Sequence, residues 1–190
     1  MREPTTSLVP QSALPAGGRV FSDTLRLSIP PQRVTLRLQV SARSLATVSA
    51  IRIAGRPLPI TANCWTGTDP VISRIAPDTW LFQSSLHDAT DILQAVRKAC
   101  GRRMFVVTDL SDTFVTFTLE GAHATALLAR GCGLDFSLST FHTSSCTRTR
   151  LAQLPAVIRR ASFERFECLV DRAVAQYLYD WFQDAAASLG

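Results

Sequence analysis

Lysine and long apolar runs are both scarce in this chain of 190 residues. Lys98 is the only lysine, so arginine supplies almost all of the positive charge behind a formal net charge of +5. No apolar run approaches the ~18 residues that a membrane-spanning helix needs. The first 18 residues contain no apolar stretch of the kind found in secretory signals, so residues 1–18 are expected to form a flexible tail. We therefore expect a cytoplasmic protein without a membrane partner.

Cysteine is present but without the spacing that disulfides or metal sites use. The chain has an odd number of cysteines, five, and no two of them form a CxxC pair. This pattern argues against a disulfide framework and against a zinc site built from thiolates. The cysteines are expected to act as small buried hydrophobic residues; they are Cys64, Cys100, Cys132, Cys146 and Cys168.

The positive charge is concentrated early in the chain. Residues 1–60 contain eight arginines but only two acidic residues, Glu3 and Asp23. A basic region of this kind is compatible with nucleic acid, with an acidic protein surface, or with ordinary solvated strand faces. Because no basic run is interleaved with aromatic residues, we expect no nucleic-acid partner.

Hydrophobic periodicity indicates a mixture of strands and helices. Residues 33–40 alternate strictly between polar and apolar side chains, which predicts a half-buried strand. Asp88 is expected to cap a helix that carries an apolar stripe and stops at Gly101. Other predicted strands cover residues 71–75, 79–83, 103–110, 113–119, 149–154, 156–160 and 163–170, and further helices begin near Gly121 and at Asp171.

The order of these elements predicts an α+β fold with largely antiparallel sheets and packed helices. The strand at 103–110 is expected to be buried and to form a hairpin with 113–119 through a turn at Ser111-Asp112. We expect one domain over residues 19–190, with two possible halves that divide near residues 101–112.

The motifs that usually carry chemistry are missing. The sequence Gly131-Cys132-Gly133 has neither a third glycine nor a Walker lysine, so it indicates a helix stop and turn and not a phosphate loop. The three histidines, His87, His123 and His142, are too far apart in sequence to form a helical metal-binding pair.

Three groups of side chains are candidate sites, and each has a simpler interpretation. His142 and Cys146 share a polar loop, but no third group orients them as a nucleophilic pair. Turn chemistry explains Asp109 and Asp112. A solvated strand face explains Glu164 and Glu167. We therefore expect no catalytic, cofactor-binding or metal-binding residue in this chain.

Aromatic side chains give the candidate anchors. Trp80, Tyr177 and Trp181 are expected either to complete the core or to anchor a partner protein, since Trp and Tyr are favoured at binding hot spots. Tyr177 and Trp181 are four residues apart, so they share one side of the last helix.

Several motifs together resemble those of folate-binding aminomethyltransferase-like proteins. Residues 75–81 (IAPDTWL) are similar to a "GPDEWL" element, and residues 106–112 (VVTDLSD) to a "VTDvSd" element. Residues 119–132 resemble the helical segment that follows these two elements in the same family. Thr79 stands where Glu is common in the family.

The final third of the chain is similar to one branch of that superfamily, the gamma subunit of heterotetrameric sarcosine oxidase. The similar residues are Cys146, Thr149, Leu151, 169–172 (LVDR) and 177–181 (YLYDW). The resemblance extends from about residue 33 to residue 186 and implies an aminomethyltransferase-like domain.

The resemblance implies a subunit that holds no cofactor and assembles with alpha, beta and delta subunits. In that family FAD and a covalent FMN lie on or beside beta, NAD and tetrahydrofolate on alpha, and zinc on delta. The complex oxidises sarcosine to glycine, passes the one-carbon unit to tetrahydrofolate and reduces oxygen to peroxide. Two alternatives stay open: a gamma-type subunit of a related N-methyl amino acid dehydrogenase, and a freestanding folate-binding aminomethyltransferase-like protein.

Overall fold

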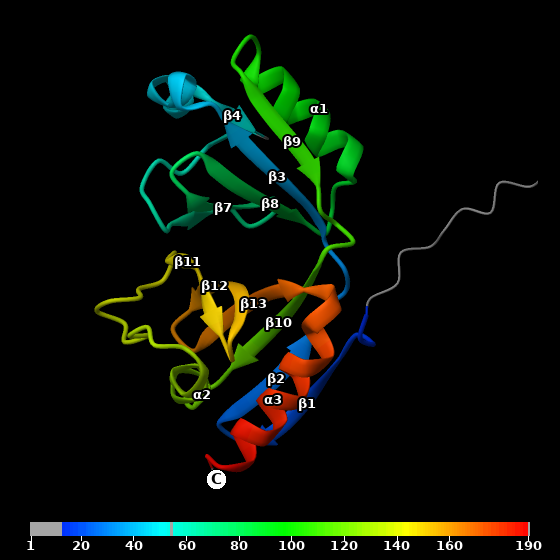
Figure 1. The fold of residues 1–190 in the computed structure, drawn as a ribbon, viewed down its shortest axis with the longest axis vertical. Coiled ribbons are helices and arrows are strands. Elements are labelled where there is room, and N and C mark those ends of the chain that lie inside the picture. Colours follow the sequence, from blue (N-terminus) through cyan, green and yellow to red (C-terminus); the bar gives the residue numbers. More distant parts are fainter. Residues whose placement is uncertain (1–12, 54, 190) are drawn as a thin grey trace, which may run out of the picture.

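Two antiparallel β-sheets lie one above the other along the long axis of the molecule (Figure 1). The computed structural model describes residues 13–53 and 55–189. The five-stranded sheet has the order β6-β7-β8-β3-β9, and the six-stranded sheet has the order β1-β2-β10-β13-β12-β11. This arrangement confirms the predicted α+β class with antiparallel sheets and packed helices. Within the described part of the chain, no helix combines the length and apolar character needed to cross a bilayer.

The five-stranded sheet is built from one continuous stretch of chain. Its strands are β3 (Val34–Val40), β6 (Trp65–Thr66), β7 (Val71–Ala76), β8 (Thr79–Ser84) and β9 (Phe105–Asp109). Helix α1 (Ala89–Cys100), a 3-10 segment (Ala42–Ala50) and the short pair β4 (Arg52–Ile53) and β5 (Arg56–Pro57) accompany it.

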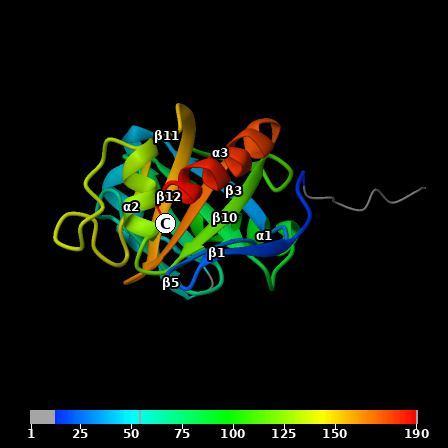
Figure 2. The same ribbon diagram turned by 90° about the horizontal axis from the view of Figure 1, so that it is seen from below.

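The six-stranded sheet joins both ends of the chain. Its strands are β1 (Gly17–Ser22), β2 (Leu25–Ile29), β10 (Phe114–Glu120), β11 (Cys146–Leu151), β12 (Leu154–Ser162) and β13 (Arg165–Asp171). Helix α2 (Ala124–Gly131), a 3-10 turn (Arg172–Val174) and helix α3 (Ala175–Ala187) complete this unit. Figure 2 shows α2 and α3 together at the end of the molecule seen from below.

Local signals fix the first strand and the first helix of the five-stranded sheet. In β3, Leu36 and Leu38 are buried while Arg37 and Gln39 are exposed, which confirms the predicted alternation. The Asp88 side chain accepts a hydrogen bond of 2.8 Å from the backbone N–H of Asp91, confirming the predicted N-cap of α1. The apolar face of α1 then covers the apolar face of β3 and the two share one core.

The predicted hairpin between residues 103–110 and 113–119 is wrong. β9 pairs with β3 in one sheet, whereas β10 pairs with β13 and β2 in the other. β9 is also an edge strand and not a buried one, and the side chain of Val106 is 61% exposed. The turn residues at 110–113 carry the chain from sheet to sheet because each strand finds its apolar partners in a different sheet.

The chain crosses between the sheets twice, at residues 30–33 and 110–113, and hydrogen bonds join the second crossing to the start of β3. The N–H of Leu110 donates to the Thr35 carbonyl at 2.8 Å, and the N–H of Thr35 donates to the Ser111 hydroxyl at 3.0 Å. The domain boundary predicted near residues 101–112 stays a prediction. Strands β1 and β2 precede the first crossing and belong to the six-stranded sheet. Of the predicted tail 1–18, residues 1–12 lie outside the described residues, whereas Gly17 and Gly18 begin β1.

All three strands and the helix of the final third have other boundaries than the sequence predicted. The predicted strand 149–154 is interrupted at Ala152 and Gln153, whose φ angles of 49° and 68° form the turn between β11 and β12. Asp171 caps a 3-10 turn through the N–H of Ala173, and α3 follows only at Ala175. The Ala-Gln pair lacks the Asn-Gly signature that usually marks such turns, so the sequence did not predict it.

Candidate functional site

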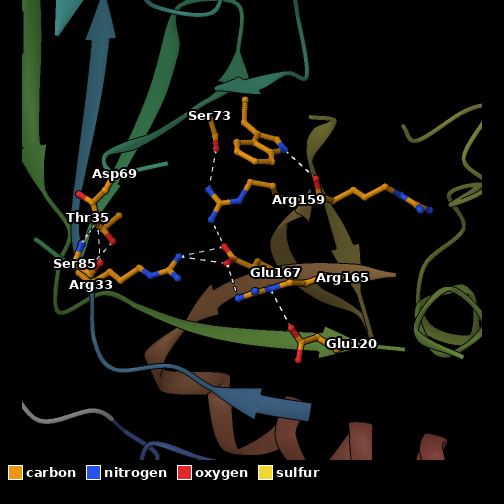
Figure 3. Close-up of polar contacts among 11 residues, drawn as sticks. Arg33, Thr35, Asp69, Ser73, Ser85, Glu120, Arg159, Arg165 and Glu167 are labelled. Carbon is orange, nitrogen blue, oxygen red and sulfur yellow. Dashed lines mark hydrogen bonds and ion pairs between the residues drawn. The ribbon is translucent and has the colours of Figure 1, made fainter. Parts of the chain in front are cut away.

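A buried ion-pair cluster holds the two sheets together (Figure 3). Glu167 on β13 lies opposite Arg159 on β12, and their charged groups are in contact. Arg159 also donates to the Ser73 hydroxyl of β7 at 3.3 Å, while Arg33, from the first crossing, lies 3.2 Å from the Glu167 carboxylate. The cluster therefore ties the six-stranded sheet to the five-stranded sheet and to one of the crossings.

Burial and charge act in opposite directions on Glu167. Burial by itself would raise the pKa of its carboxyl, but the positive charges of Arg159 and Arg33 and the hydrogen bond from Arg159 outweigh it. The pKa of Glu167 is consequently lowered from 4.5. Burial lowers the pKa of Arg159, an effect that the Glu167 carboxylate partly offsets. The carboxylate of Glu167 is therefore charged at neutral pH.

The solvated-face interpretation of Glu167 is therefore wrong, whereas Glu164 is exposed as expected. Glu167 shares its strand face with Leu169, and that face meets the other sheet. A strand face that carries Arg165, Glu167 and Asp171 resembles a solvated one in sequence. Only the stacking of the second sheet distinguishes the two cases.

A second set of contacts joins the sheets around Trp65 of β6. Its indole N–H donates to the Arg160 carbonyl at 3.0 Å, and the Arg159 guanidinium lies 5.3 Å from the centre of its ring. Backbone hydrogen bonds add to these contacts, from the N–H of Trp65 to the Ser144 carbonyl and from the N–H of Cys146 to the Asn63 carbonyl. The two sheets are thus joined along one side by both side chains and backbone.

On another side of the junction the sheets separate to leave an inter-sheet cleft of about 380 Å³. Its apolar floor includes Leu81 from the five-stranded sheet and Val157 and Leu169 from the six-stranded sheet, all buried. Arg37 and Arg148 line it from opposite sheets and are exposed. The remaining lining residues are Gln39, Ile75, Ala76, Thr79, Leu110, Phe114, Pro155, Ala156 and Asp171.

The His142 and Cys146 pair does not form a nucleophile. The ring Nδ1 of His142 lies 3.1 Å from the Ser145 hydroxyl, and the buried thiol of Cys146 donates to the Arg74 carbonyl at 3.5 Å. Burial raises the pKa of Cys146 to about 12, so the thiol stays protonated at neutral pH. Because the thiolate is the reactive form, this cysteine is inert as a nucleophile.

Asp109 and the buried cysteines have structural roles, and Asp112 is exposed. The Asp109 carboxylate accepts hydrogen bonds from the N–H and hydroxyl of Ser111, as turn chemistry predicts. The five cysteines are free, and all but Cys64 are buried, which confirms their expected packing role. Within residues 13–53 and 55–189, no three His, Cys, Asp or Glu residues gather closely enough to hold a metal ion.

The candidate aromatic anchors lie in three different environments. Trp80 is fully buried in the five-stranded sheet and donates from its indole N–H to the Pro59 carbonyl at 2.9 Å. Trp181 is half-buried on α3 and packs edge-on against Phe182, while Tyr177 is 54% exposed. Trp80 thus belongs to the core, and a partner-binding role for Tyr177 stays a prediction.

Gly131 has a role that the sequence did not reveal. It is the last residue of α2, and a Cβ atom there would lie 2.6 Å from the ring of Trp181. The absence of a side chain therefore allows Trp181 to lie on the α2 backbone and fasten α3 to α2. The interpretation of Gly131 as a helix stop is therefore incomplete, because the absence of a side chain at this position is also needed for the contact with Trp181.

The arrangement of the two sheets belongs to the aminomethyltransferase-like fold. The chain superposes on the glycine cleavage system aminomethyltransferase T from Bartonella henselae with a TM-score of 0.58 and 15% identity. The match covers 81% of this chain and 44% of that one, so the chain spans less than half of the transferase. A stronger match is heterotetrameric sarcosine oxidase from Corynebacterium sp. U-96 in complex with pyrrole 2-carboxylate, with a TM-score of 0.73 and 21% identity. It covers 86% of this chain and 84% of that one.

Within this fold the sequence defines the family. Residues 40–188 match the sarcosine oxidase, gamma subunit family, and the chain belongs to that family. This finding confirms the resemblance that the motifs of the final third indicated. No curated protein sequence matches the chain.

Proposed function

We propose that this chain is a non-catalytic gamma subunit in a cytoplasmic heterotetrameric sarcosine oxidase, where it supports assembly of alpha, beta and delta subunits. FAD, FMN, NAD, tetrahydrofolate and zinc are proposed to lie on those partners and not on this chain. The membership of residues 40–188 in the gamma subunit family carries the proposal.

The use that the chain makes of its buried polar groups supports a structural role. Glu167 and Arg159 bridge the two sheets instead of facing an enclosed substrate site. The thiol of Cys146 is buried and protonated, and it hydrogen-bonds to the Arg74 carbonyl and not to His142. A catalytic pair would need the opposite arrangement, with a reactive form that reaches substrate.

Reconstitution with and without this chain tests the proposal. The alpha, beta and delta subunits would be co-expressed alone and together with this chain, and sarcosine-dependent peroxide formation and complex mass would be measured. We expect the four-chain complex to be active and the purified gamma chain alone to show no turnover and no flavin absorbance. Turnover by the isolated chain, or its failure to join the other subunits, would contradict the proposal.

A further inference from the structure

We propose that the inter-sheet cleft is a docking site for an extended segment of a partner subunit that carries an acidic residue beside an apolar one. The inference rests on the proposed function, since it requires that the chain assembles with other subunits. It adds to that function the surface used and the chemistry of the segment bound.

The charge of the cleft favours an acidic occupant. Within the described residues, the guanidinium groups of Arg37 and Arg148 have no hydrogen bond or ion pair. Asp171, the one acidic residue among the lining residues, already accepts a hydrogen bond from the N–H of Ala173. The two unpaired guanidinium groups on opposite walls therefore favour a negatively charged partner. Such charge complementarity steers an acidic partner into place and selects against basic ones.

The floor of the cleft favours an apolar group next to that charge. Leu81, Val157 and Leu169 form a small apolar cluster of their own, apart from the cores of the two sheets. Ile75, Leu110 and Phe114 pack against it and are only partly buried. An apolar side chain from outside would complete the burial of these groups and gain the free energy of removing them from water.

The position of the cleft favours a segment of protein over a small molecule. It is open to solvent between two sheets, and its cations lie at its exposed edges, whereas small-molecule sites enclose most of the ligand surface. Gln39 and Thr79, polar lining residues from the five-stranded sheet, are already hydrogen-bonded to Asp78 at 3.1 and 2.8 Å. Few polar groups thus remain to orient a small ligand, while charge and apolar area suit a chain that continues beyond the cleft.

A pair of double variants tests the contribution of charge. In Arg37→Glu/Arg148→Glu the two cleft cations are reversed. In the control, Arg52→Glu/Arg150→Glu, the same change in net charge is made at exposed arginines that do not line the cleft. Binding of each purified variant to the co-expressed alpha, beta and delta subunits would be measured at several salt concentrations. We expect the cleft variant to bind about tenfold more weakly or worse, and the control to bind like wild type.

A photo-crosslink tests where the partner lies. A benzoylphenylalanine at Pro155, an exposed lining residue, is expected to cross-link to one partner peptide that contains Asp or Glu next to an apolar residue. The same group at Thr90, an exposed residue of α1 outside the cleft, is the control. Mutating the acid in that peptide to Arg should restore binding to the cleft variant.

The outcomes separate this inference from the proposed function. If the chain assembles, but the cleft variant binds like wild type and Pro155 gives no cross-link to a partner, the inference is wrong and the proposed function stands. If the chain does not assemble at all, both are wrong. A bound anionic small molecule found by native mass spectrometry, with no cross-link to a partner, would overturn the docking role.

Discussion

The two sheets differ in how they use buried polarity. Within the described residues, every buried charged side chain lies in the six-stranded sheet: Arg159, Arg160 and Glu167. The buried polar residues of the five-stranded sheet are neutral, and Ser73 among them accepts a hydrogen bond from Arg159. The six-stranded sheet thus supplies the buried charges of the junction, and the five-stranded sheet supplies neutral partners and the ring of Trp65. Because a buried charge needs specific partners, this asymmetry fixes how the sheets stack.

The sheets also differ in how their cores are built. The aromatic ring pairs of the described chain all lie in the core of the six-stranded sheet, such as Phe117 with Phe182 at 5.6 Å between ring centres. The core of the five-stranded sheet is mainly aliphatic, with Trp80 and Phe82 at its centre. The five-stranded sheet is continuous in sequence, whereas the six-stranded sheet needs residues from both sides of it.

Trp80→Ala should have the largest effect, because it empties the centre of the five-stranded sheet. The side chain is fully buried and its indole hydrogen bond to Pro59 would be lost. We expect the free energy of unfolding to fall by about 3–5 kcal/mol, measured by urea denaturation. A change below 1 kcal/mol would show that this core does not depend on the indole.

Glu167→Gln should destabilise the protein by about 3 kcal/mol, since it leaves Arg159 buried without its counter-charge. Glu164→Gln is the matched control, because Glu164 precedes β13 closely but is exposed. Its substitution should change the free energy of unfolding by no more than about 0.5 kcal/mol. Equal effects for the two variants would show that the junction does not need the charge.

Trp181→Ala should cost less than about 3 kcal/mol, because the side chain is only half-buried on α3. Gly131→Ala tests the same contact from the other side, since its methyl group would displace the indole ring. Thermal unfolding of both variants and of the double variant should show effects that are not additive. If the two single effects simply add in the double variant, Trp181 and Gly131 do not interact energetically.

Acid should weaken the junction through Glu167. Its folded-state pKa lies below 4.5, so its contribution to stability is complete above about pH 4.5 and is lost as pH falls through the folded-state pKa. The free energy of unfolding of wild type should therefore fall more steeply below pH 4.5 than that of Glu167→Gln. Parallel pH profiles for the two proteins would contradict this assignment.

Gln153→Gly should have the smallest effect and the opposite sign. Gln153 is exposed and has a φ of 68°, a conformation that glycine adopts without strain. Removing that strain should raise the melting temperature by an amount that corresponds to less than about 1 kcal/mol. Gln183→Gly, inside α3, is the contrasting control and should lower it.

Sequence reasoning succeeded where the signal is local. The alternation of β3 and the Asp88 cap of α1 each depend on a few neighbouring residues, and both are confirmed. Sequence reasoning failed where the structure depends on contacts between residues far apart in the sequence. The pairing of β9 with β3 and not with β10 is set by which sheet completes each apolar face.

The candidate site was harder to predict than the fold for the same reason. The buried state of Glu167 follows from a second sheet stacked on its strand, and no residue near it in sequence signals that sheet. The role of Gly131 likewise depends on Trp181, which is fifty residues away in the chain. By contrast, the family was recognisable from short motifs, because those motifs are themselves local.

The burial of most cysteine thiols in this chain affects its resistance to oxidation. Burial raises the pKa of Cys146 to about 12 and raises the pKa of Cys168 further, so neither offers the thiolate that oxidants attack. Cys100 and Cys132 are buried as well, which leaves Cys64 as the one cysteine whose thiol is partly exposed. A protein proposed to stand beside a source of hydrogen peroxide is thereby shielded against sulfenylation at four of its five cysteines.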